Sequence, residues 1–377
     1  MSNEKHTMKN ATIELMRFIF ASAIVLFHTG RDVWTKRKIV GTIGAFKISF
    51  FRRGYYGVEF FFLLTGLLMA ASIWRSMESS KAARMPVGEE TVFFLSRKSK
   101  AIAPFYLTAC AMMILVNLWQ GTPLKKIAEK LPSILFLNRF GFTKEKLLTV
   151  AWYLAAMLIA LAVVYPLCRK FYGTFTTLIA PLVGLTLLGI LVHETGDLVE
   201  INERFLFTYK MNLRAIAEIS LGATCFEIAR RLENKPFSDG KRLLFSLIAA
   251  GGFAATLIYM ASFAPKRKGW IVVLFLCPAL VITWSRIGLI GRSGVLQRKF
   301  FLFLGSLSLP LYLFQNIPRA IVPVVLKNAR PGVRAVSAYL LSLALALIAC
   351  CAQKMHHRCQ TPVVQSEPEG SDPRGAK

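Results

Sequence analysis

The stretch GVEFFFLLTGLLMAASIW, residues 57–74, contains one charged side chain, Glu59, in an otherwise apolar run. A helix needs about 20 apolar residues to cross a hydrocarbon core of about 30 Å, so this run predicts a membrane-spanning helix. A carboxylate inside such a helix is costly and usually has a partner or a function. The stretch therefore predicts a membrane fold and also marks a candidate functional residue.

The rest of the chain repeats this pattern. Of its 377 residues, 55% are hydrophobic, and the mean hydropathy of +0.50 is too high for a water-soluble domain of this size. The sequence predicts an all-α, polytopic membrane bundle of about ten transmembrane helices, at residues 11–29, 57–74, 101–119, 149–167, 174–193, 212–229, 243–263, 270–285, 300–325 and 335–352.

The predicted spans define the domains. A short N-terminal segment, 1–10, precedes a membrane domain at 11–352, and the tail 353–377 has the composition of disorder. We expect the span at 300–325 to be kinked, because it contains Pro310 and Pro318.

The net charge of +27 does not indicate a nucleic-acid-binding protein. All but three of the 47 Lys and Arg residues fall outside the predicted spans, where they can contact anionic headgroups or ligands. No aromatic–basic recognition module accompanies them. The distribution of basic residues does not fix the orientation, but an even number of spans places both termini on one side.

Metal and cofactor sites are not indicated. The seven cysteines form no C-x-x-C motif and no Cys/His metal spacing, and most lie in or beside spans, where Cys acts as a small hydrophobe. We therefore expect neither a metal nor a bound cofactor.

The first span carries two candidate functional residues on one face. Arg17 and His28 are 11 residues apart, which is about 20° past three full helical turns and about 16 Å along the axis. Alternatively, Arg17 forms a structural pair with Glu14, three residues away, and His28 lies at the membrane interface.

Glu59 is predicted to meet His28. The first span ends and the second begins on the same side of the membrane, so the two side chains lie at similar depth. A carboxylate beside an imidazole raises its basicity and fixes its tautomer, as in a catalytic base and its orienting group. Alternatively, Glu59 pairs with a loop cation such as Arg52 or Arg53.

A pair of cations precedes the third span. In FFLSRKSKAIAPFY, residues 93–106, Arg97 and Lys100 are three apart and could clamp phosphate near a helix N-terminus. Alternatively, they hold lipid headgroups. This span starts on the side opposite His28, with Arg17 between in depth. A long ligand with an anionic head and a reactive tip, such as a coenzyme A thioester, could bridge the two sides.

Further polar groups are expected on the His28 side. Trp152 and Tyr153 open the fourth span, and Ser308, Tyr312 and Gln315 recur at spacings of four and three on one face of the ninth. They could support the binding of a second substrate. For Trp152 and Tyr153 the alternative is an interfacial aromatic belt.

Five segments in order resemble the motifs of the membrane-bound acyltransferase-3 family, over about residues 11–350. They are IELMRFIFASAIVLFH, with an Arg 11 residues before the His; GYYGVEFFFLLTGLLM, similar to G-x-x-G-V-[DE]-x-F-F-x-x-[ST]-G; FFLSRKSKAIAPFY, similar to R-x-x-R followed by Pro; AWYLAAMLIALAVVYPL, similar to W-Y-L…Y-P; and LGSLSLPLYLFQ, similar to G-x-x-S-x-x-[IL]-Y-L-x-H.

The resemblance implies a stand-alone ten-helix O-acyltransferase, a multi-pass protein of the bacterial inner membrane with both termini cytoplasmic. It implies transfer of an acyl group, commonly acetyl, from cytoplasmic acyl-CoA to a hydroxyl of an envelope carbohydrate or a similar molecule. The essential His of the family matches His28, its first-helix Arg matches Arg17, and the first Arg of R-x-x-R matches Arg97.

Two positions depart from the family pattern. Lys100 replaces the second Arg, which keeps the charge but loses the planar two-toothed grip. Gln315 replaces the His of the last motif and cannot act as an acid or base.

These features together predict a membrane O-acyltransferase. His28 would be the base or acyl carrier with Glu59; Arg17, Arg97 and Lys100 would bind acyl-CoA; and a hydroxyl acceptor would bind near Trp152, Tyr153, Ser308, Tyr312 and Gln315. The alternatives are a transporter or carrier of a lipid-linked or acylated envelope molecule, in which the polar groups line a pathway, and a sensor or scaffold without chemistry.

Overall fold

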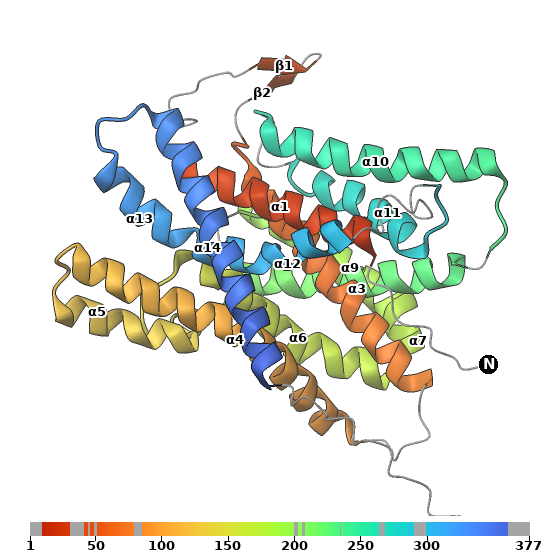
Figure 1. The fold of residues 1–377 in the computed structure, drawn as a ribbon. Helices are drawn as coiled ribbons and strands as arrows, with labels where there is room; N and C mark the ends of the chain where they lie inside the picture. The colour runs from red at the N-terminus through yellow and green to blue at the C-terminus, as the bar shows by residue number, and fades with distance from the viewer. Residues whose placement is uncertain are drawn as a thin grey trace, which may run out of the picture.

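A computed structural model describes residues 10–30, 41–43, 46–48, 51–78, 85–199, 203–205, 208–233, 235–263, 268–289 and 299–360. The described chain is a bundle of helices with two very short antiparallel hairpins (Figure 1). Each of the ten predicted spans coincides with helical structure, which confirms the predicted fold class.

The helices are α1 Ala11–Thr29, α3 Gly57–Glu78, α4 Val87–Trp119, α5 Leu124–Lys130, α6 Trp152–Lys170, α7 Tyr172–Thr174, α8 Ala180–Thr195, α9 Lys210–Leu232, α10 Asp239–Ala261, α11 Ile271–Ser285, α12 Lys299–Phe314, α13 Asn316–Val325 and α14 Pro331–Gln360. Short 3-10 turns lie at η1 Gly54–Tyr56, η2 Leu131–Leu135, η3 Leu137–Arg139 and η4 Thr149–Ala151, and a π-helical turn, η5, at Phe175–Ile179. Strands β1 Gly41–Ile43 and β2 Phe46–Ile48 form one hairpin, and β3 Arg204–Phe205 and β4 Thr208–Tyr209 form the other.

Seven helices of the described chain are long and apolar enough to span a membrane, and the pair α12–α13 makes an eighth if it counts as one span. That pair bends by 60° between Phe314 and Asn316. The bend confirms the predicted kink, and its position has a local cause. Pro318 lacks a backbone N–H, and its ring would clash with the carbonyl of Phe314 in a continuous helix.

The helix with the most charges lies at the centre. α9 has the weakest apolar character of the ten predicted spans, yet most of its residues are buried and it packs on α3, α6, α8 and α11. α3 and α9 approach closely because Gly66 lies against the carbonyl of Ile219, and Gly222 lies against the carbonyl of Leu63. Small residues at a crossing are the usual way for membrane helices to pack tightly.

A second close helix contact joins α1 and α12. The two helices run in the same direction, because Gly305 meets Glu14 near their starts and Leu311 packs with Ala21 and Val25 further along. α3 meets α1 from another side, where the Phe60 ring stacks on Phe20 with centroids 4.5 Å apart.

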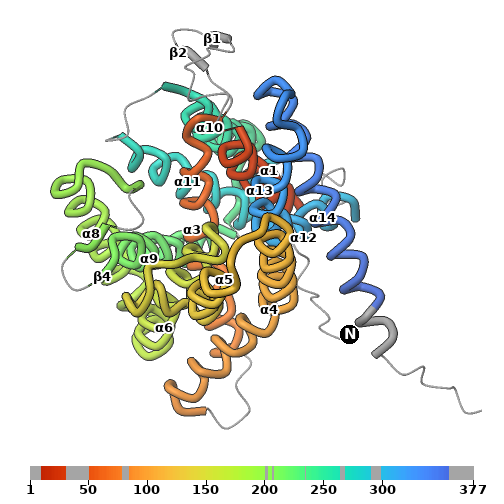
Figure 2. Tube along the Cα trace, turned by 90° about the vertical axis from the view of Figure 1, so that its left-hand side faces the viewer, coloured from red at the N-terminus to blue at the C-terminus, as the bar shows by residue number. Residues whose placement is uncertain are grey.

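Two helices are longer than the apolar runs predict. α4 begins at Val87, well before the predicted start at 101, and α14 continues to Gln360, into the segment predicted as tail. Residues 1–9 and 361–377, which make up most of the two predicted terminal segments, lie outside the described residues. α10 lies near the top of the bundle, and α4 and α5 lie below it, in both views (Figures 1 and 2).

Candidate functional site

Arg17 lies in the first half of α1, at the contact with α12. Its Nη1 donates to both carboxylate oxygens of Glu14, at 3.1 and 2.8 Å. A Cβ on Gly305 would lie 2.6 Å from the Glu14 Cβ, so the absence of a side chain there leaves room for the ion pair. The Glu14–Arg17 ion pair that the sequence offered as the alternative for Arg17 is therefore present. The Arg17 side chain keeps 29% of its surface exposed and can still contact a ligand.

His28 lies in the last turn of α1, half-buried. Its ring is 4.8 Å from the Phe27 ring in an edge-on arrangement. Because α1 is a regular helix between the two positions, Arg17 and His28 lie on one face, about 16 Å apart along the axis. The helical period alone is enough to predict this shared face.

Glu59 has a different partner from the one predicted. Its Oε2 contacts Nη2 of Arg214 on α9, and its other oxygen, Oε1, has no hydrogen-bond partner among the described residues. The reason is the orientation of α3 about its own axis. Phe60 stacks on Phe20 of α1, so the neighbouring Glu59, about 100° around the helix, faces α9 instead. The ion pair of Glu59 seen among the described residues is therefore with Arg214, whereas the alternative named loop cations such as Arg52 or Arg53.

Arg214 joins two buried carboxylates. Its Nε donates to Glu218 at 3.1 Å, Nη1 donates to the carbonyl of Leu198 at 2.8 Å, and Nη2 contacts Glu59. Both glutamates are fully buried, and Arg214 is 2% exposed. We call these three residues the Arg214 cluster. One oxygen of each carboxylate, Glu59 Oε1 and Glu218 Oε2, has no hydrogen-bond partner among the described residues.

The polar residues predicted on the His28 side do gather. The Tyr153 and Tyr312 rings are 5.7 Å apart, Trp152 lies edge-on to Tyr153, and the Tyr312 hydroxyl donates to the carbonyl of Val150 at 2.7 Å. All three are at least nine-tenths buried, so they are not a lipid-facing aromatic belt. The Tyr153 hydroxyl also interacts with Thr65 of α3.

Gln315 and Ser308 lie on the same helix face with different surroundings. The Gln315 amide donates to the Tyr312 carbonyl at 2.6 Å, while its buried oxygen has no partner among the described residues. Ser308 is buried one helical turn before Tyr312 and donates to the Gly305 carbonyl at 2.8 Å, so it lies nearer the Glu14–Arg17 pair.

Sequence reasoning missed two basic residues between the predicted spans, Arg139 and Lys146, of which Arg139 lies in the neighbourhood of Tyr312. Arg139, in η3, is only 4% exposed and lies in the neighbourhood of Tyr209 and Tyr312. Burial lowers the pKa of Arg139. Burial also lowers the pKa of Lys146, and the positive charge of Arg139 lowers it further.

The predicted cation pair on α4 points away from the bundle. Arg97 and Lys100 are both exposed, and the Arg97 guanidinium lies 5.8 Å from the Phe93 ring centroid. The residue between them that faces inward is Lys98, which is half-buried and interacts with the charge of Arg17. Lys98 is thus turned more toward the bundle than the two residues that the motif spacing selected.

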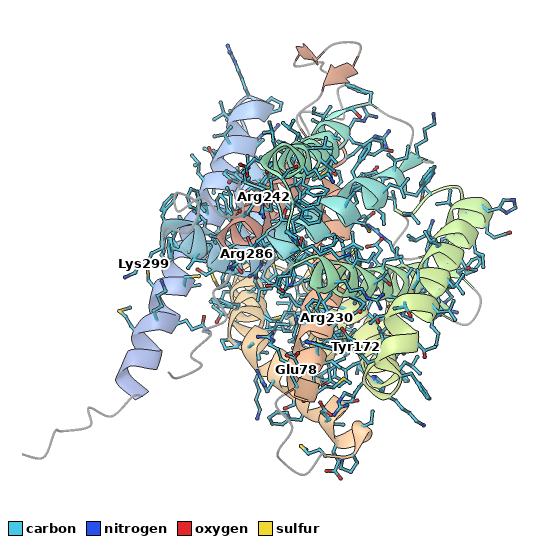
Figure 3. All side chains as sticks on the ribbon, turned by 90° about the vertical axis from the view of Figure 1, so that its right-hand side faces the viewer. Glu78, Tyr172, Arg230, Arg242, Arg286 and Lys299 are labelled. Atoms are coloured by element: carbon cyan, nitrogen blue, oxygen red, sulfur yellow. The ribbon has the colours of Figure 1, made fainter. Side chains whose placement is uncertain are left out.

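Two ion-pair networks, one around Glu90 and one around Glu227, join helices of the bundle. Glu90 of α4 accepts from Arg169 at 2.7 Å and from the Tyr165 hydroxyl at 3.1 Å. Arg230 pairs with Glu227 and lies 3.9 Å from the Trp74 ring centroid. Figure 3 shows Arg230 beside Tyr172, whose hydroxyl also donates to Glu227, with Glu78 nearby.

A cavity of about 310 Å³ lies between α1, α10 and α11. It is lined mainly by apolar residues, among them Met16 and Phe253. No group of three or more His, Cys, Asp or Glu residues that could hold a metal ion occurs in the described part of the chain.

The family model of the acyltransferase-3 group, described as an acyltransferase domain, matches residues 10–352. The chain belongs to the acyltransferase-3 family. The match covers every described helix up to the middle of α14, and so includes the Arg17–His28 face, the Arg214 cluster and the tyrosines around Gln315. No curated protein and no solved structure gives a significant match to the chain.

This acyltransferase-3 chain is therefore a membrane-embedded acyltransferase. Its site offers one imidazole, buried hydroxyls and partly buried cations. Such groups can accept a proton from a hydroxyl, orient an acceptor and neutralise an anionic donor.

Proposed function

We propose that this acyltransferase-3 protein is an O-acyltransferase that moves an acyl group, in the first instance acetyl, from acyl-CoA to a hydroxyl of a cell-envelope carbohydrate. The family match over residues 10–352 carries the proposal, because it spans the helices from α1 into α14 and includes Arg17 and His28 on one face of α1. The setting is the bacterial inner membrane, with both termini and the donor on the cytoplasmic side.

His28 is the proposed general base. Its neutral imidazole takes the proton of the acceptor hydroxyl as that oxygen attacks the thioester carbonyl. The new C–O ester bond forms, the C–S bond breaks, and the departing thiolate takes the proton from the imidazolium. A transient acyl-imidazole on His28 is the alternative route to the same products.

Glu59 acts as a positioning residue in this proposal. Its contact with Arg214 fixes the start of α3 on α9. The same start lies against α1 close to His28, since a Cβ on Gly54 would meet Phe27 and a Cβ on Gly57 would meet Ile24. The Arg214 cluster thereby fixes the start of α3, against which the His28 end of α1 packs.

The acceptor is proposed to bind among Trp152, Tyr153, Tyr312 and Gln315. Buried aromatic rings supply flat apolar contact, and the free oxygen of Gln315 offers an acceptor for a hydroxyl hydrogen. The donor is proposed to enter at the other end of α1, where Arg17 lies inside and Arg97 and Lys100 lie on the rim.

The test is transfer by the purified, full-length protein in lipid nanodiscs. Acetyl-CoA and envelope glycans are supplied, free CoA is followed with a thiol reagent, and acetylated glycan is detected by mass spectrometry. His28→Ala should abolish glycan-dependent CoA release. His193→Ala is the matched control, because the His193 side chain is 85% exposed and pairs with Glu194, its neighbour in the sequence. Wild-type turnover by His28→Ala would refute the mechanism.

A carrier function is the second candidate, and the 60° break between α12 and α13 favours it. Broken helices line the substrate sites of many transporters. The same assay separates the two functions, because a carrier binds or moves the envelope molecule without releasing CoA from acetyl-CoA.

A further inference from the structure

α4 continues well past the point where its neighbour α6 begins. The two helices are antiparallel, because Phe94 stacks on Tyr165 with ring centroids 4.4 Å apart and, one turn along both helices, Glu90 accepts from Arg169. The start of α6 therefore lies level with a point about 13 residues after Phe94. From there α4 runs on for about 12 residues, or about 18 Å, which we call its outer half.

Residues 124–151, which we call the inserted segment, lie beside the outer half of α4. Near the end of α4, Lys130 Nζ donates to Asn117 Oδ1 at 2.8 Å. About 16 Å lower on the same helix, the Tyr106 hydroxyl donates to the carbonyl of Ile134 at 3.1 Å. Figures 1 and 2 both show α5, the first part of the segment, beside α4. The segment thus returns along α4 to the level where α6 begins, and its last turn, η4, leads directly into α6.

Apolar side chains of the inserted segment face outward. Leu135, Phe140 and Phe142 are between 61% and 79% exposed. The outer half of α4 exposes Leu115 and Trp119 in the same way, as expected of a helix that contacts lipid. Large exposed apolar side chains on both elements indicate that the inserted segment also lies at membrane depth. Irregular backbone is tolerated there only where protein buries it or water reaches it.

Polar groups at the foot of the inserted segment indicate where water reaches it. Thr149 is exposed, its hydroxyl donates to Asn316 Oδ1 at 2.8 Å, and Arg319 Nη1 donates to both oxygens at 3.4 Å. α13, which carries Asn316 and Arg319, also lies beside the end of α4, because Gln120 Nε2 donates to the carbonyl of Ala320 at 3.0 Å. A hydroxyl and a guanidinium exposed to hydrocarbon would be costly. Water therefore reaches Thr149, where the inserted segment meets α13.

This junction adjoins the acceptor site proposed above. Val150, the residue after Thr149, accepts the hydrogen bond from the Tyr312 hydroxyl at 2.7 Å. Gln315, whose free oxygen was assigned to the acceptor, directly precedes Asn316. A molecule that reaches Thr149 through water is thus next to the residues proposed to bind the acceptor.

The inserted segment is strongly basic. It contains six Lys or Arg residues and two acidic residues, and Arg319 of α13 adds a positive charge beside Thr149. An entrance lined by one sign of charge between apolar walls concentrates ligands of the opposite sign. We propose that the inserted segment and α13 border a water-filled entrance to the acceptor site, and that the carbohydrate which uses it is negatively charged. Its use by the acceptor rests on the proposed function; the entrance and its preference for anions do not.

The first experiment measures access by water. Thr149→Cys and Leu115→Cys, each in full-length protein in nanodiscs, are treated with two water-soluble methanethiosulfonates, one carrying a sulfonate and one a trimethylammonium group. Intact mass spectrometry follows labelling above the wild-type level, and each rate is divided by that of the reagent with free mercaptoethanol. Thr149→Cys should be labelled, several-fold faster by the sulfonate reagent. Leu115→Cys is the matched control, because Leu115 is 64% exposed but faces lipid, and it should stay unlabelled.

The second experiment measures anion preference in binding, without any acyl donor. Tetragalacturonic acid and its methyl ester, which has the same sugar chain without charge, are titrated by calorimetry into the protein in zwitterionic nanodiscs. The acid should bind more tightly, and less so at higher salt. Arg319→Gln should weaken binding of the acid roughly 10-fold or more, the loss expected for one hydrogen bond between charged groups, and leave the ester unchanged. Arg319→Lys should restore most of the affinity, and Lys241→Gln, at an exposed lysine of α10, is the control for lost charge.

The outcomes separate this inference from the proposed function. Equal labelling of Thr149→Cys and Leu115→Cys would overturn the entrance, and equal affinity for the acid and the ester would overturn the anion preference. If Arg319→Gln loses a co-purifying anionic phospholipid in native mass spectrometry but keeps its affinity for the acid, the basic residues hold lipid headgroups and the preference is also overturned. Selective binding of the acid, lost in Arg319→Gln, in a wild-type protein that releases no CoA with any glycan, would uphold the entrance and reject the transferase.

Discussion

Replacement of Arg214 by methionine tests how much the buried Arg214 cluster contributes to the stability of the bundle. Methionine keeps much of the side-chain length but removes all five donors. Glu59 and Glu218 would then face each other's charge in a fully buried place with no cation in contact. The carbonyl of Leu198 would lose the donor that lies 2.8 Å away.

The expected loss of stability is large. Two unit charges 4 Å apart interact by about 4 kcal/mol at an effective dielectric constant near 20, and Arg214 makes two such contacts. Breaking a buried pair by removing one partner costs about 3–5 kcal/mol, because the other charge stays buried. Since native proteins are stable by only about 5–15 kcal/mol, Arg214→Met should lower the melting temperature by many degrees.

The assay is thermal unfolding of the purified protein in detergent, with a second variant that separates charge from shape. In Arg214→Met/Glu59→Gln/Glu218→Gln no charge is left in the cluster, so most of the lost stability should return. Arg231→Met is the control on the same helix, because the Arg231 side chain is 59% exposed and its pair with Glu227 should contribute about 1 kcal/mol or less. The reasoning would be refuted if Arg214→Met had the melting temperature of the wild type, or if the triple variant were no more stable than Arg214→Met.

Two further variants test contacts made by small groups. Gly222→Ala should cost about 1–3 kcal/mol in thermal unfolding, because the new Cβ would lie 2.9 Å from the carbonyl carbon of Leu63 and neither backbone can move freely. Gly189→Ala, where a Cβ meets open space, should not destabilise the protein, and an equal effect of both changes would contradict the close helix contact. Tyr312→Phe should cost about 1 kcal/mol by removing the hydroxyl that donates to Val150, and an unchanged melting temperature would show that this bond is not formed.

The fold could be predicted from the sequence because the spans depend on local composition. An apolar run of about 20 residues indicates a membrane helix wherever it occurs, and the ten runs became helices. The ends were less predictable. α4 begins at Val87 with the charged residues Glu89 and Glu90 in its first turn, and α14 continues past the last apolar residues. A helix that continues beyond the apolar run has no hydropathy signal that reveals it.

The candidate site was predictable where the relation between two residues depends on a single helix. Arg17 and His28 share a face because both lie on α1, and the helical period alone decides that. The partner of Glu59 was not predictable in this way, since it depends on how α3 rotates against α1 and α9. Lys98 could have been found from spacing, because residues 94, 98, 102 and 105 form the inward stripe of α4. The R-x-x-R pattern directed attention to its outward neighbours instead.

The position of α9 at the centre follows from the same physics that made it the weakest predicted span. In translocon-insertion measurements, a charged residue such as Arg or Asp at the middle of a lone membrane helix costs about 2.5–3.5 kcal/mol. Arg214 and Glu218 each become tolerable when they face one another, and Glu59 of α3 adds a contact that no lipid can supply. Gly66 and Gly222 bring the two backbones near enough for that contact. The charges that lower the hydropathy of α9 are therefore the groups that fix it against α3, and through the start of α3 they fix the wall beside His28.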